Sequence, residues 1–232
     1  MSQESLLRPI QPCCFDIPWL IRYNPDNRIL SERQYAIAKR IMDLSVVLLT
    51  APLWLVALVV CALAIKLESP RAPVFYRQRR TGRAGRPIQM LKFRTMVPNA
   101  KEMEAQLAHL NKLKWPDFKI DNDPRVTRVG RILRKTSLDE LPQVLNILRG
   151  EMSLVGPRPT SFLVETYTLW ETARLDVIPG MTGLWQITHR TELEFYDRSR
   201  LDILYVQHRC LMLDIEILLR TIPAALRGKG AH

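Results

Sequence analysis

Two acidic residues stand side by side in the segment RKTSLDELPQ, at residues 134–143. Ser137 followed three residues later by Glu140 fits a capping box, in which each side chain bonds a free backbone N–H at a helix start. Pro142 would then fall inside that helix and remove a hydrogen bond, so the helix would begin nearer Asp139 or be bent. The neighbouring carboxylates of Asp139 and Glu140 could instead form a reaction centre, and this segment alone leaves both interpretations open.

Basic residues close to short turns favour the second interpretation. Arg158 lies between two prolines in the segment GPRPT, and their fixed φ angles hold its backbone. A guanidinium held in this way suits two-pronged contact with phosphate or carboxylate. Together with the acidic pair, such bases indicate a phosphate site in which a divalent cation on a carboxylate offsets phosphate charge. The other bases near turns are Lys92, Arg94, Arg131, Arg134, Lys135 and Arg190.

Several other familiar sites are missing from the sequence. It contains no Walker A loop, no Gly-x-Gly-x-x-Gly segment and no Gly-x-Ser-x-Gly elbow, and its cysteines and histidines show no metal-ligand spacing. The segment Asp121-Asn122-Asp123 resembles the Asp-x-Asp metal site of sugar-nucleotide glycosyltransferases, although the same residues suit a turn. A membrane-tethered glycosyltransferase that uses this segment is therefore one alternative function.

Composition and charge indicate an anionic partner. The 232 residues have a hydrophobic content of 47% and a net charge of +11. These values indicate a folded core that binds nucleic acid, an anionic membrane or phosphorylated substrates. Nucleic acid is disfavoured, because the bases do not alternate with aromatic residues and do not gather along one helix. A non-enzymatic basic protein bound to the membrane remains as a second alternative.

An uncharged run of about 22 residues, from Leu44 to Ile65, is long enough as a helix to cross a bilayer. Basic residues flank both ends, whereas the positive-inside rule places such residues on the cytoplasmic side. Pro52 lies inside the run and bends a helix. We therefore expect residues 39–67 to form a re-entrant membrane hairpin broken at Pro52, with Thr50 bonding a freed carbonyl. A kinked span is the alternative.

The expected fold class is mainly α with a small β-hairpin. Residues 1–38 carry several prolines and are expected to form a loosely ordered leader. Residues 68–232 are expected to form a cytoplasmic catalytic domain that rests on the membrane surface. The patterns predict a hairpin from 74–80 and 88–96, and helices at 99–113 with Asn99 as N-cap, from near 138, at 161–175 and across 193–226. The C-terminal helices also suit a membrane surface.

Four longer motifs make the sequence resemble a known family. They are KRIMDLSVVLL, FYRQRRTGRAGRPIQMLKFRTM, DPRVTRVGRILRKTSLDELPQVLNILRGEMSLVGPRP and PGMTGLWQI. In this order they closely resemble the bacterial sugar transferase family, the monotopic polyprenyl-phosphate phosphoglycosyl transferases. The resemblance runs from about Tyr35 to Arg227 and leaves residues 1–34 outside. Because the large multi-span N-terminal region of some members is absent, the sequence resembles the short form.

The resemblance implies an enzyme that catalyses a two-step transfer. In the family, the Asp of the Asp-Glu pair attacks the sugar-linked phosphate of a nucleotide diphosphate sugar. The nucleoside monophosphate leaves, and a phosphosugar stays on the enzyme until polyprenyl phosphate accepts it. Carried over to this sequence, Asp139 is the nucleophile and, with Mg²⁺, a metal ligand. Glu140 is the neighbouring acid, expected to act as a base toward the incoming phosphate.

The resemblance also assigns residues around the acidic pair. Arg134 matches the phosphate-contacting Arg of the family, and Arg158 matches the Arg of its Pro-Arg-Pro turn. Pro52 matches the proline at which the re-entrant helix of the family breaks. His189 is a departure, because many members have Gly at that position. The further phosphate-binding residues expected here are Lys92, Arg94 and Arg190.

The expected partners follow from the same resemblance. They are a UDP-sugar, undecaprenyl phosphate and the lipid of the bacterial inner membrane, with the catalytic domain facing the cytoplasm. The pathways expected for such a transfer are the synthesis of exopolysaccharide, capsule, O-antigen or a related glycoconjugate. The sequence names neither the sugar nor the polymer, and it leaves a homodimer open.

Overall fold

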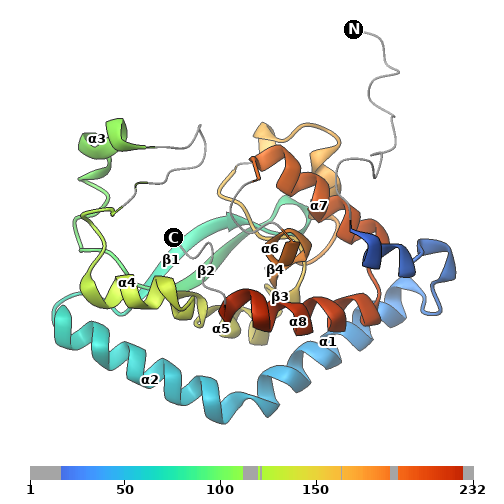
Figure 1. The fold of residues 1–232 in the computed structure, drawn as a ribbon, viewed down its shortest axis with the longest axis horizontal. Helices are drawn as coiled ribbons and strands as arrows, with labels where there is room; N and C mark the ends of the chain where they lie inside the picture. The colour runs from blue at the N-terminus through green and yellow to red at the C-terminus, as the bar shows by residue number, and fades with distance from the viewer. Residues whose placement is uncertain (1–16, 112–119, 121, 163, 189–192, 227–232) are drawn as a thin grey trace, which may run out of the picture.

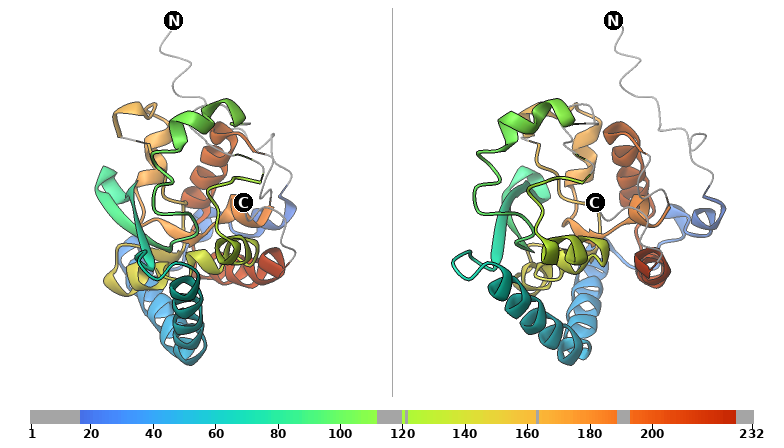
Figure 2. Two further views of the ribbon diagram at one scale, coloured as in Figure 1. Left: turned by 90° about the vertical axis from the view of Figure 1, so that its left-hand side faces the viewer. Right: turned by 60° about the vertical axis from the view of Figure 1, so that its left-hand side comes forward.

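The computed structural model describes residues 17–111, 120, 122–162, 164–188 and 193–226. Over these residues the fold is mainly helical, with two small two-stranded sheets, which confirms the expected class. Two long helices form an open V along one side of the molecule (Figure 1). The strands and the shorter helices lie on the concave side of the V, as the turned views in Figure 2 also show.

The two arms of the V are α1 (Glu32–Leu49) and α2 (Ala51–Glu68). They meet at Thr50, close to Pro52, which has no N–H with which to continue the helical ladder. The Thr50 hydroxyl donates to the carbonyl oxygen of Val46 at 2.7 Å. The indole N–H of Trp54 donates to the carbonyl oxygen of Val47 at 2.8 Å. The carbonyl that Pro52 leaves without its helical donor is that of Leu48, so the Thr50 hydroxyl bonds a different carbonyl from the one expected. The Thr50 and Trp54 side chains both bond the end of α1 at the bend.

Much of the V is covered by nothing else in the described chain. Among the described residues, α2 is the one helix long and apolar enough to cross a membrane, and only 11% of its apolar window is buried. Some other side chains of that window are half-buried, and most of the exposed ones are apolar. The exposed apolar side chains on the two arms are Ile37, Ile41, Leu48, Leu49, Leu53, Leu55, Val56, Val59, Val60, Leu63 and Leu67.

Six further helices complete the described part of the chain. Those in the C-terminal region confirm the helical expectation for residues 193–226. The chain turns between the last two at residues 209 and 210. The six helices are α3 (Glu104–Leu107), α4 (Arg128–Lys135), α5 (Gln143–Arg149), α6 (Leu184–Thr188), α7 (Phe195–His208) and α8 (Leu211–Leu226).

The N-terminal segment differs from the expected leader where it is described. Ile17 and Leu20 are buried in one hydrophobic cluster with side chains of α7 and α8. Helix α1 already begins at Glu32, so a boundary at residue 38 lies inside a helix. The proline content of the segment predicted a loose leader. Its packing could not be predicted locally, because the residues it packs against are almost 200 positions away along the chain. The remaining part of the leader, residues 1–16, lies outside the described residues.

The helix expected at residues 161–175 is wrong. The described residues form only two 3-10 turns, η8 (Val164–Thr166) and η9 (Glu171–Leu175). The carboxylate of Glu171 accepts hydrogen bonds from the backbone N–H of Thr168 at 2.8 Å and from its hydroxyl at 2.6 Å. Local bonds of this kind offer the backbone an alternative to a helix.

The helix expected at residues 99–113 is shorter than predicted. Within the described residues it is reduced to α3 and the 3-10 turn η6 (Ala108–Leu110). Asn99 is not its N-cap, because Met103 occupies that position and makes no side-chain capping bond. The end of the predicted range, residues 112–113, lies outside the described residues.

The predicted hairpin is confirmed. Strands β1 (Phe75–Thr81) and β2 (Pro87–Phe93) pair antiparallel along their full length. The turn between them places Ala84 at φ 52° and Gly85 at φ 75°. The left-handed region is easily reached by Gly, which explains how so short a connection closes.

A second sheet was not predicted. Strands β3 (Ser153–Val155) and β4 (Gly180–Thr182) pair in parallel. Each strand has only 3 residues, too few for a periodic pattern to be recognised in the sequence. A Cβ at Gly180 would lie 2.1 Å from the backbone nitrogen of Gly156, so the two segments can approach this closely only with Gly there.

Both arms of the V pack beneath the catalytic part of the fold. Helix α1 contributes to a buried cluster with β2 and α5, and α2 contributes to a separate cluster with β2 and α4. The β2–α5 contact therefore stands over α1, and the β2–α4 contact stands over α2. The central members of the first cluster are Val47, Met90 and Ile147, and those of the second are Cys61, Ile65, Phe93 and Leu133.

Candidate active site

The acidic pair lies in a tight turn between α4 and α5 and does not cap a helix. Leu138, Asp139 and Glu140 form the 3-10 turn η7. Ser137 before it has φ 58°, in the left-handed region, and its side chain makes no capping bond. The capping-box interpretation is therefore wrong. Helix α5 begins only after Pro142, which occupies its N-cap position, so the proline does set where the helix starts.

Glu140 is held by two cations from distant segments. Both terminal nitrogens of Arg158 donate to its two carboxylate oxygens, the one to Oε2 at 3.0 Å. The ammonium of Lys92 on β2 donates to Oε1 at 2.9 Å. Burial would raise the pKa of Glu140, but the two cations outweigh burial and hold it well below its usual range. Glu140 is therefore ionised and committed to these partners.

Asp139 differs from its neighbour Glu140 in its hydrogen bonds. Among the described residues, no side chain or backbone N–H bonds its carboxylate. Burial raises the pKa of Asp139, and the negative charge of Glu140 adds to the rise, while Lys92, Arg134 and Arg158 oppose it. The pair thus has one carboxylate with filled oxygens and one whose oxygens remain available to a ligand.

Of the other predicted bases, Arg134 joins the pair and Arg94 does not. The Nε of Arg134, at the end of α4, donates to the hydroxyl of Thr95 at 2.9 Å, and its charge acts on Asp139. Burial lowers the pKa of Arg134, and Asp139 opposes that shift. Arg94 instead donates to the carbonyl of Pro73 at 3.0 Å, so it points to the foot of the hairpin. Arg190 and the neighbouring departure, His189, lie outside the described residues.

A second arginine, which sequence reasoning missed, supports the Pro-Arg-Pro turn. Arg174 of η9 donates to the backbone carbonyl of Arg158 at 2.8 Å and forms a buried ion pair with Asp202 of α7. Burial raises the pKa of Asp202 to about 6, although Arg174 opposes the shift. No local motif marks these two residues, which meet across 28 positions of the chain.

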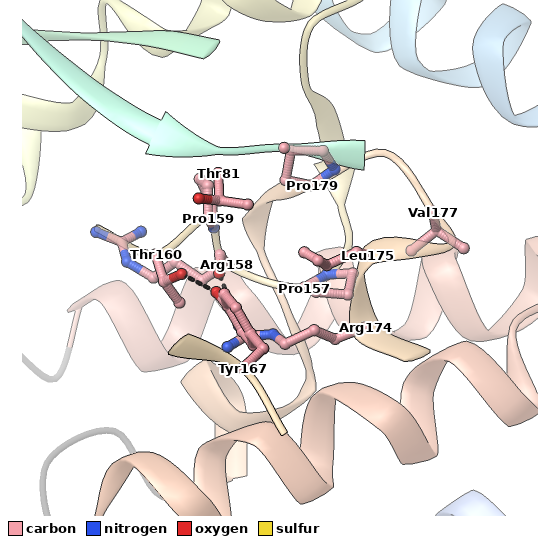
Figure 3. A pocket seen from close by; sticks show the side chains of 11 residues that line it. Thr81, Pro157, Arg158, Pro159, Thr160, Tyr167, Arg174, Leu175, Val177 and Pro179 are labelled. Carbon is pink, nitrogen blue, oxygen red and sulfur yellow. Dashed lines mark hydrogen bonds between the residues drawn. The ribbon is translucent and has the colours of Figure 1, made fainter. Parts of the chain in front are cut away.

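The turn is closely packed from this side. A cavity of about 10 Å³, room for about one water, lies against it (Figure 3). Figure 3 shows Tyr167 bonded to Thr160 at the edge of this cavity. A sugar nucleotide therefore cannot enter here, and a ligand of Arg158 has to approach from the side of the acidic pair.

A buried amide on α5, also missed, holds the strand that carries Lys92. The side chain of Asn146 accepts from the backbone N–H of Leu91 at 3.0 Å and donates to the carbonyl of Gln89 at 2.8 Å. A neighbouring β-strand would bond these two groups in the same way. Asn146 therefore fixes β2 on α5 one residue before Lys92, and this places the ammonium on Glu140.

The Asp-Asn-Asp segment forms a structural turn where it is described. Asp123 is buried, and the guanidinium of Arg125 bonds both of its carboxylate oxygens, with the shortest contact at 2.7 Å. Asn122 has φ 51°, a backbone conformation typical of Asn in turns. Asp121 lies outside the described residues. Since its carboxylate is occupied by Arg125, Asp123 is a poor metal ligand.

The side chains around Asp139 fit magnesium only if substrate phosphates and water supply most of its ligands. Among the described residues, no three His, Cys, Asp or Glu side chains are placed to hold a metal ion together. Mg²⁺ is commonly held by one or two carboxylates together with substrate phosphates and water. The open carboxylate of Asp139 fits such a shared site, whereas the filled carboxylate of Glu140 does not.

Comparison with known proteins identifies relatives over most of the chain. A UDP-galactose-lipid carrier transferase of Erwinia amylovora is 41% identical over 208 residues, which are 88% of this chain and 43% of the relative. The exopolysaccharide production protein ExoY of Rhizobium meliloti is 41% identical over 192 residues, 80% of this chain and 82% of the relative. A UDP-glucose:undecaprenyl-phosphate glucose-1-phosphate transferase of Caulobacter vibrioides is 42% identical over 204 residues, 84% and 72% of the two chains.

The Erwinia protein is much longer than this chain, which spans less than half of its length. The ExoY match covers most of both chains, so the shared part is a unit that also occurs with little else attached. The model of the family described as bacterial sugar transferase matches residues 34–228 and so includes every segment that forms the acidic pair and its cations. The chain belongs to the bacterial sugar transferase family.

Proposed function

We propose that this protein transfers a sugar 1-phosphate from a UDP-sugar to undecaprenyl phosphate and releases UMP. The observation that carries the proposal is the pairing of an unbonded carboxylate, Asp139, with a neighbour, Glu140, that gathers Arg158 and Lys92. The relatives named as galactose and glucose phosphate transferases to a lipid carrier support it. The ExoY relatives support a role in exopolysaccharide production.

The first step is the attack of an Asp139 carboxylate oxygen on the sugar-linked phosphorus. The bond between that phosphorus and the oxygen bridging to the nucleotide breaks, UMP leaves with the electron pair, and an aspartyl phosphosugar remains. A carboxylate is a workable nucleophile toward an anionic diphosphate only where cations neutralise the phosphates. The positive charges of Arg158, Lys92 and Arg134 all act on Asp139.

In the second step, a phosphate oxygen of undecaprenyl phosphate attacks the same phosphorus and Asp139 leaves. The acceptor oxygen is already anionic at neutral pH, so its attack needs little help from a base. Glu140, with its strongly lowered pKa and filled oxygens, is a weak proton acceptor. We therefore assign Glu140 to holding Arg158 and Lys92 in place, in preference to the base role that the family resemblance suggests.

Magnesium fits the proposal as a shared ligand of Asp139 and the substrate phosphates. When bound there, the ion would offset phosphate charge that the arginines alone leave uncompensated.

We also propose that the V is a re-entrant hairpin in the cytoplasmic leaflet of the inner membrane. Both of its arms are tied to the same folded unit. Glu32 at the start of α1 pairs with Arg209. Arg40 near the middle of α1 bonds α5, and Glu68 at the end of α2 bonds the start of α4. A helix with both ends on one compact domain cannot leave them on opposite membrane faces. The exposed apolar surface of the arms supports insertion. A lipid acceptor explains why the site stands directly over this surface.

The exposed side of α8 supports contact with the same membrane surface. It carries Met212, Ile215, Leu219 and Ile222, which are 42 to 68% exposed. Figure 1 places α8 beside α1, on the side of the domain that the V borders. Apolar side chains on one face of a surface helix are typical of interfacial helices.

The alternative functions lack support at their key residues. A glycosyltransferase that uses the Asp-Asn-Asp segment would need Asp123, which is bound to Arg125. A purely binding protein has no need for a buried carboxylate that is kept free of partners. The decisive experiment incubates purified protein with a panel of UDP-sugars and undecaprenyl phosphate, then measures UMP and labelled lipid product.

The covalent route has its own test. Wild-type protein incubated with UDP-sugar labelled on the β-phosphate, without acceptor, should retain label through denaturation. Asp139→Asn should retain none and should form no lipid product. Product formation without any trapped label would favour direct displacement. Full turnover by Asp139→Asn would refute the nucleophile assignment.

A further inference from the structure

The arms of the V make polar contacts with the two sides of the active site separately. Arg40 of α1 donates to the carbonyls of Ile147 at 2.5 Å and Leu148 at 2.9 Å, in the last turn of α5. Asp43, one turn further along α1, is 2% exposed. It accepts from the hydroxyl of Ser153 at 2.7 Å and from a backbone N–H of β3 at 3.2 Å.

These contacts fall on the segment that joins the two ends of the Glu140–Arg158 ion pair. Glu140 lies three residues before α5 begins, and Arg158 lies three residues after β3 ends. The ion pair closes this α5–β3 unit at one end. Arg40 and Asp43 hold the turn between α5 and β3 at the other end, so the position of α1 fixes how the unit is oriented.

The second arm holds a different part of the site. Glu68, the last residue of α2, accepts from the first backbone N–H groups of α4, Arg128 at 2.8 Å and Val129 at 3.0 Å. An acid at this position is also favoured by the helix dipole. Arg134 lies at the other end of the same short helix. The position of α2 therefore fixes where Arg134 stands.

We propose that Asp43 and Glu68 are positioning residues through which the broken helix sets the distance between Arg134 and the Glu140–Arg158 pair. The bend between Ala51 and Thr50 joins the two arms, so its angle becomes a determinant of the catalytic geometry. The kinetic test of this proposal rests on the proposed function. The structural claim, that two anchors place the two sides of the site, is independent of that function.

The kinetic test compares Asp43→Ala and Glu68→Ala with a matched control, Glu32→Ala. Glu32 is also on the V and also ion-paired, to Arg28 at 2.8 Å and Arg209 at 2.7 Å, but away from the site. Per mole of folded enzyme, kcat for UMP release should fall about 10- to 100-fold in both test variants, because a displacement of about 1 Å has such an effect. KM should change by less than about threefold, and the control should keep its kcat.

The conservative variants separate positioning from folding. Asp43→Asn keeps an acceptor oxygen for the backbone N–H of Leu154, and its amide N–H can donate to the Ser153 hydroxyl, so kcat should recover to within about threefold of wild type. Glu68→Gln keeps only one of the two acceptor oxygens that bond α4, so kcat should recover only in part. Asp43→Ala combined with Arg158→Lys should lose less than the product of the two single losses, because both changes disturb the same ion pair. A loss of kcat in the double variant equal to the product of the two single losses would overturn the proposal. An unchanged kcat in both alanine variants would also overturn it.

A distance measurement decides the inference even without turnover. Spin labels on cysteines replacing Arg131 of α4 and Arg149 of α5, both exposed, report the separation of the two sides. In protein lacking its native cysteines, Asp43→Asn and Glu32→Ala should keep the wild-type distribution, and Asp43→Ala and Glu68→Ala should shift or broaden it. Unchanged distributions in both alanine variants would overturn the proposal. Failure of every UDP-sugar would instead count against the proposed function alone.

Discussion

At the scale of single residues, two adjacent carboxylates have opposite surroundings. Glu140 has its oxygens filled by Arg158 and Lys92, while Asp139 has no bonding partner among the described residues. A 3-10 turn makes this possible, because successive side chains point in directions about 120° apart. The left-handed backbone of Ser137 turns the chain away from α4 just before the pair. One short turn thus fills the oxygens of one acid and leaves those of the other open to a ligand.

The division of roles predicts the behaviour of Glu140→Gln. The amide cannot neutralise Arg158 and Lys92 together, so both cations should drift and the first step should slow by about 100-fold. The measurement is single-turnover UMP release without acceptor, with Glu32→Gln as the control. If Glu140 were instead the base of the second step, UMP release would stay normal and only transfer to the lipid would slow.

The ionised side chain of Asp139 should lower the stability of the folded protein. Because burial raises its pKa above the ordinary 3.8, its charged form is less favourable in the folded than in the unfolded state. Asp139→Asn should therefore raise the Tm at pH 7. That gain should be complete above the raised pKa and should shrink as pH falls from there toward 3.8, where the unfolded carboxyl also becomes protonated. Thermal unfolding at pH 7 and near pH 4.5 checks this, and a Tm gain that grows on acidification would contradict it.

At the scale of elements, helices and strands with a periodic pattern could be predicted from the sequence. Short elements, and elements held by distant parts of the chain, could not. The alternating runs of β1 and β2 and the apolar helices α7 and α8 carry their own patterns, so the sequence predicted them. The 3-residue strands β3 and β4 and the turns of η9 depend on partners far along the chain. For the same reason the sequence singled out the acidic pair and Arg158, but not Arg174 or Asn146, whose roles appear only after folding.

The link between β2 and α5 is a sharp test at this scale. Asn146→Leu keeps the volume but leaves the buried N–H of Leu91 and the carbonyl of Gln89 without their partner. The free energy of unfolding should fall by about 2 to 4 kcal/mol. Denaturant unfolding measures this, with the exposed Asn99→Leu as the control. A loss no larger than that of the control would show that β2 does not depend on Asn146.

At the scale of the whole molecule, an apolar V and a basic catalytic unit are made into one body. The buried clusters join α1 and α2 to β2, and polar side chains at the ends of the arms add fixed points. Another buried carboxylate, Asp214 of α8, is paired with Lys39 of α1 at 3.0 Å. The net charge of +11 attracts anionic groups in general, so it suits both a phosphorylated substrate and an anionic membrane face.

This architecture predicts the topology of the chain in the membrane. Single cysteines replacing Arg33 and Arg71, exposed near the two ends of the V, should react with an impermeant maleimide from the cytoplasmic side only. A cysteine at the exposed Glu165 marks that side as a control, and one at Leu53, near the bend, should react only after detergent is added. Because one folded unit holds both ends, they must share a face. Labelling of the Arg33 position from the periplasm would establish a kinked span and would separate α1 from its contacts with α5 and β3.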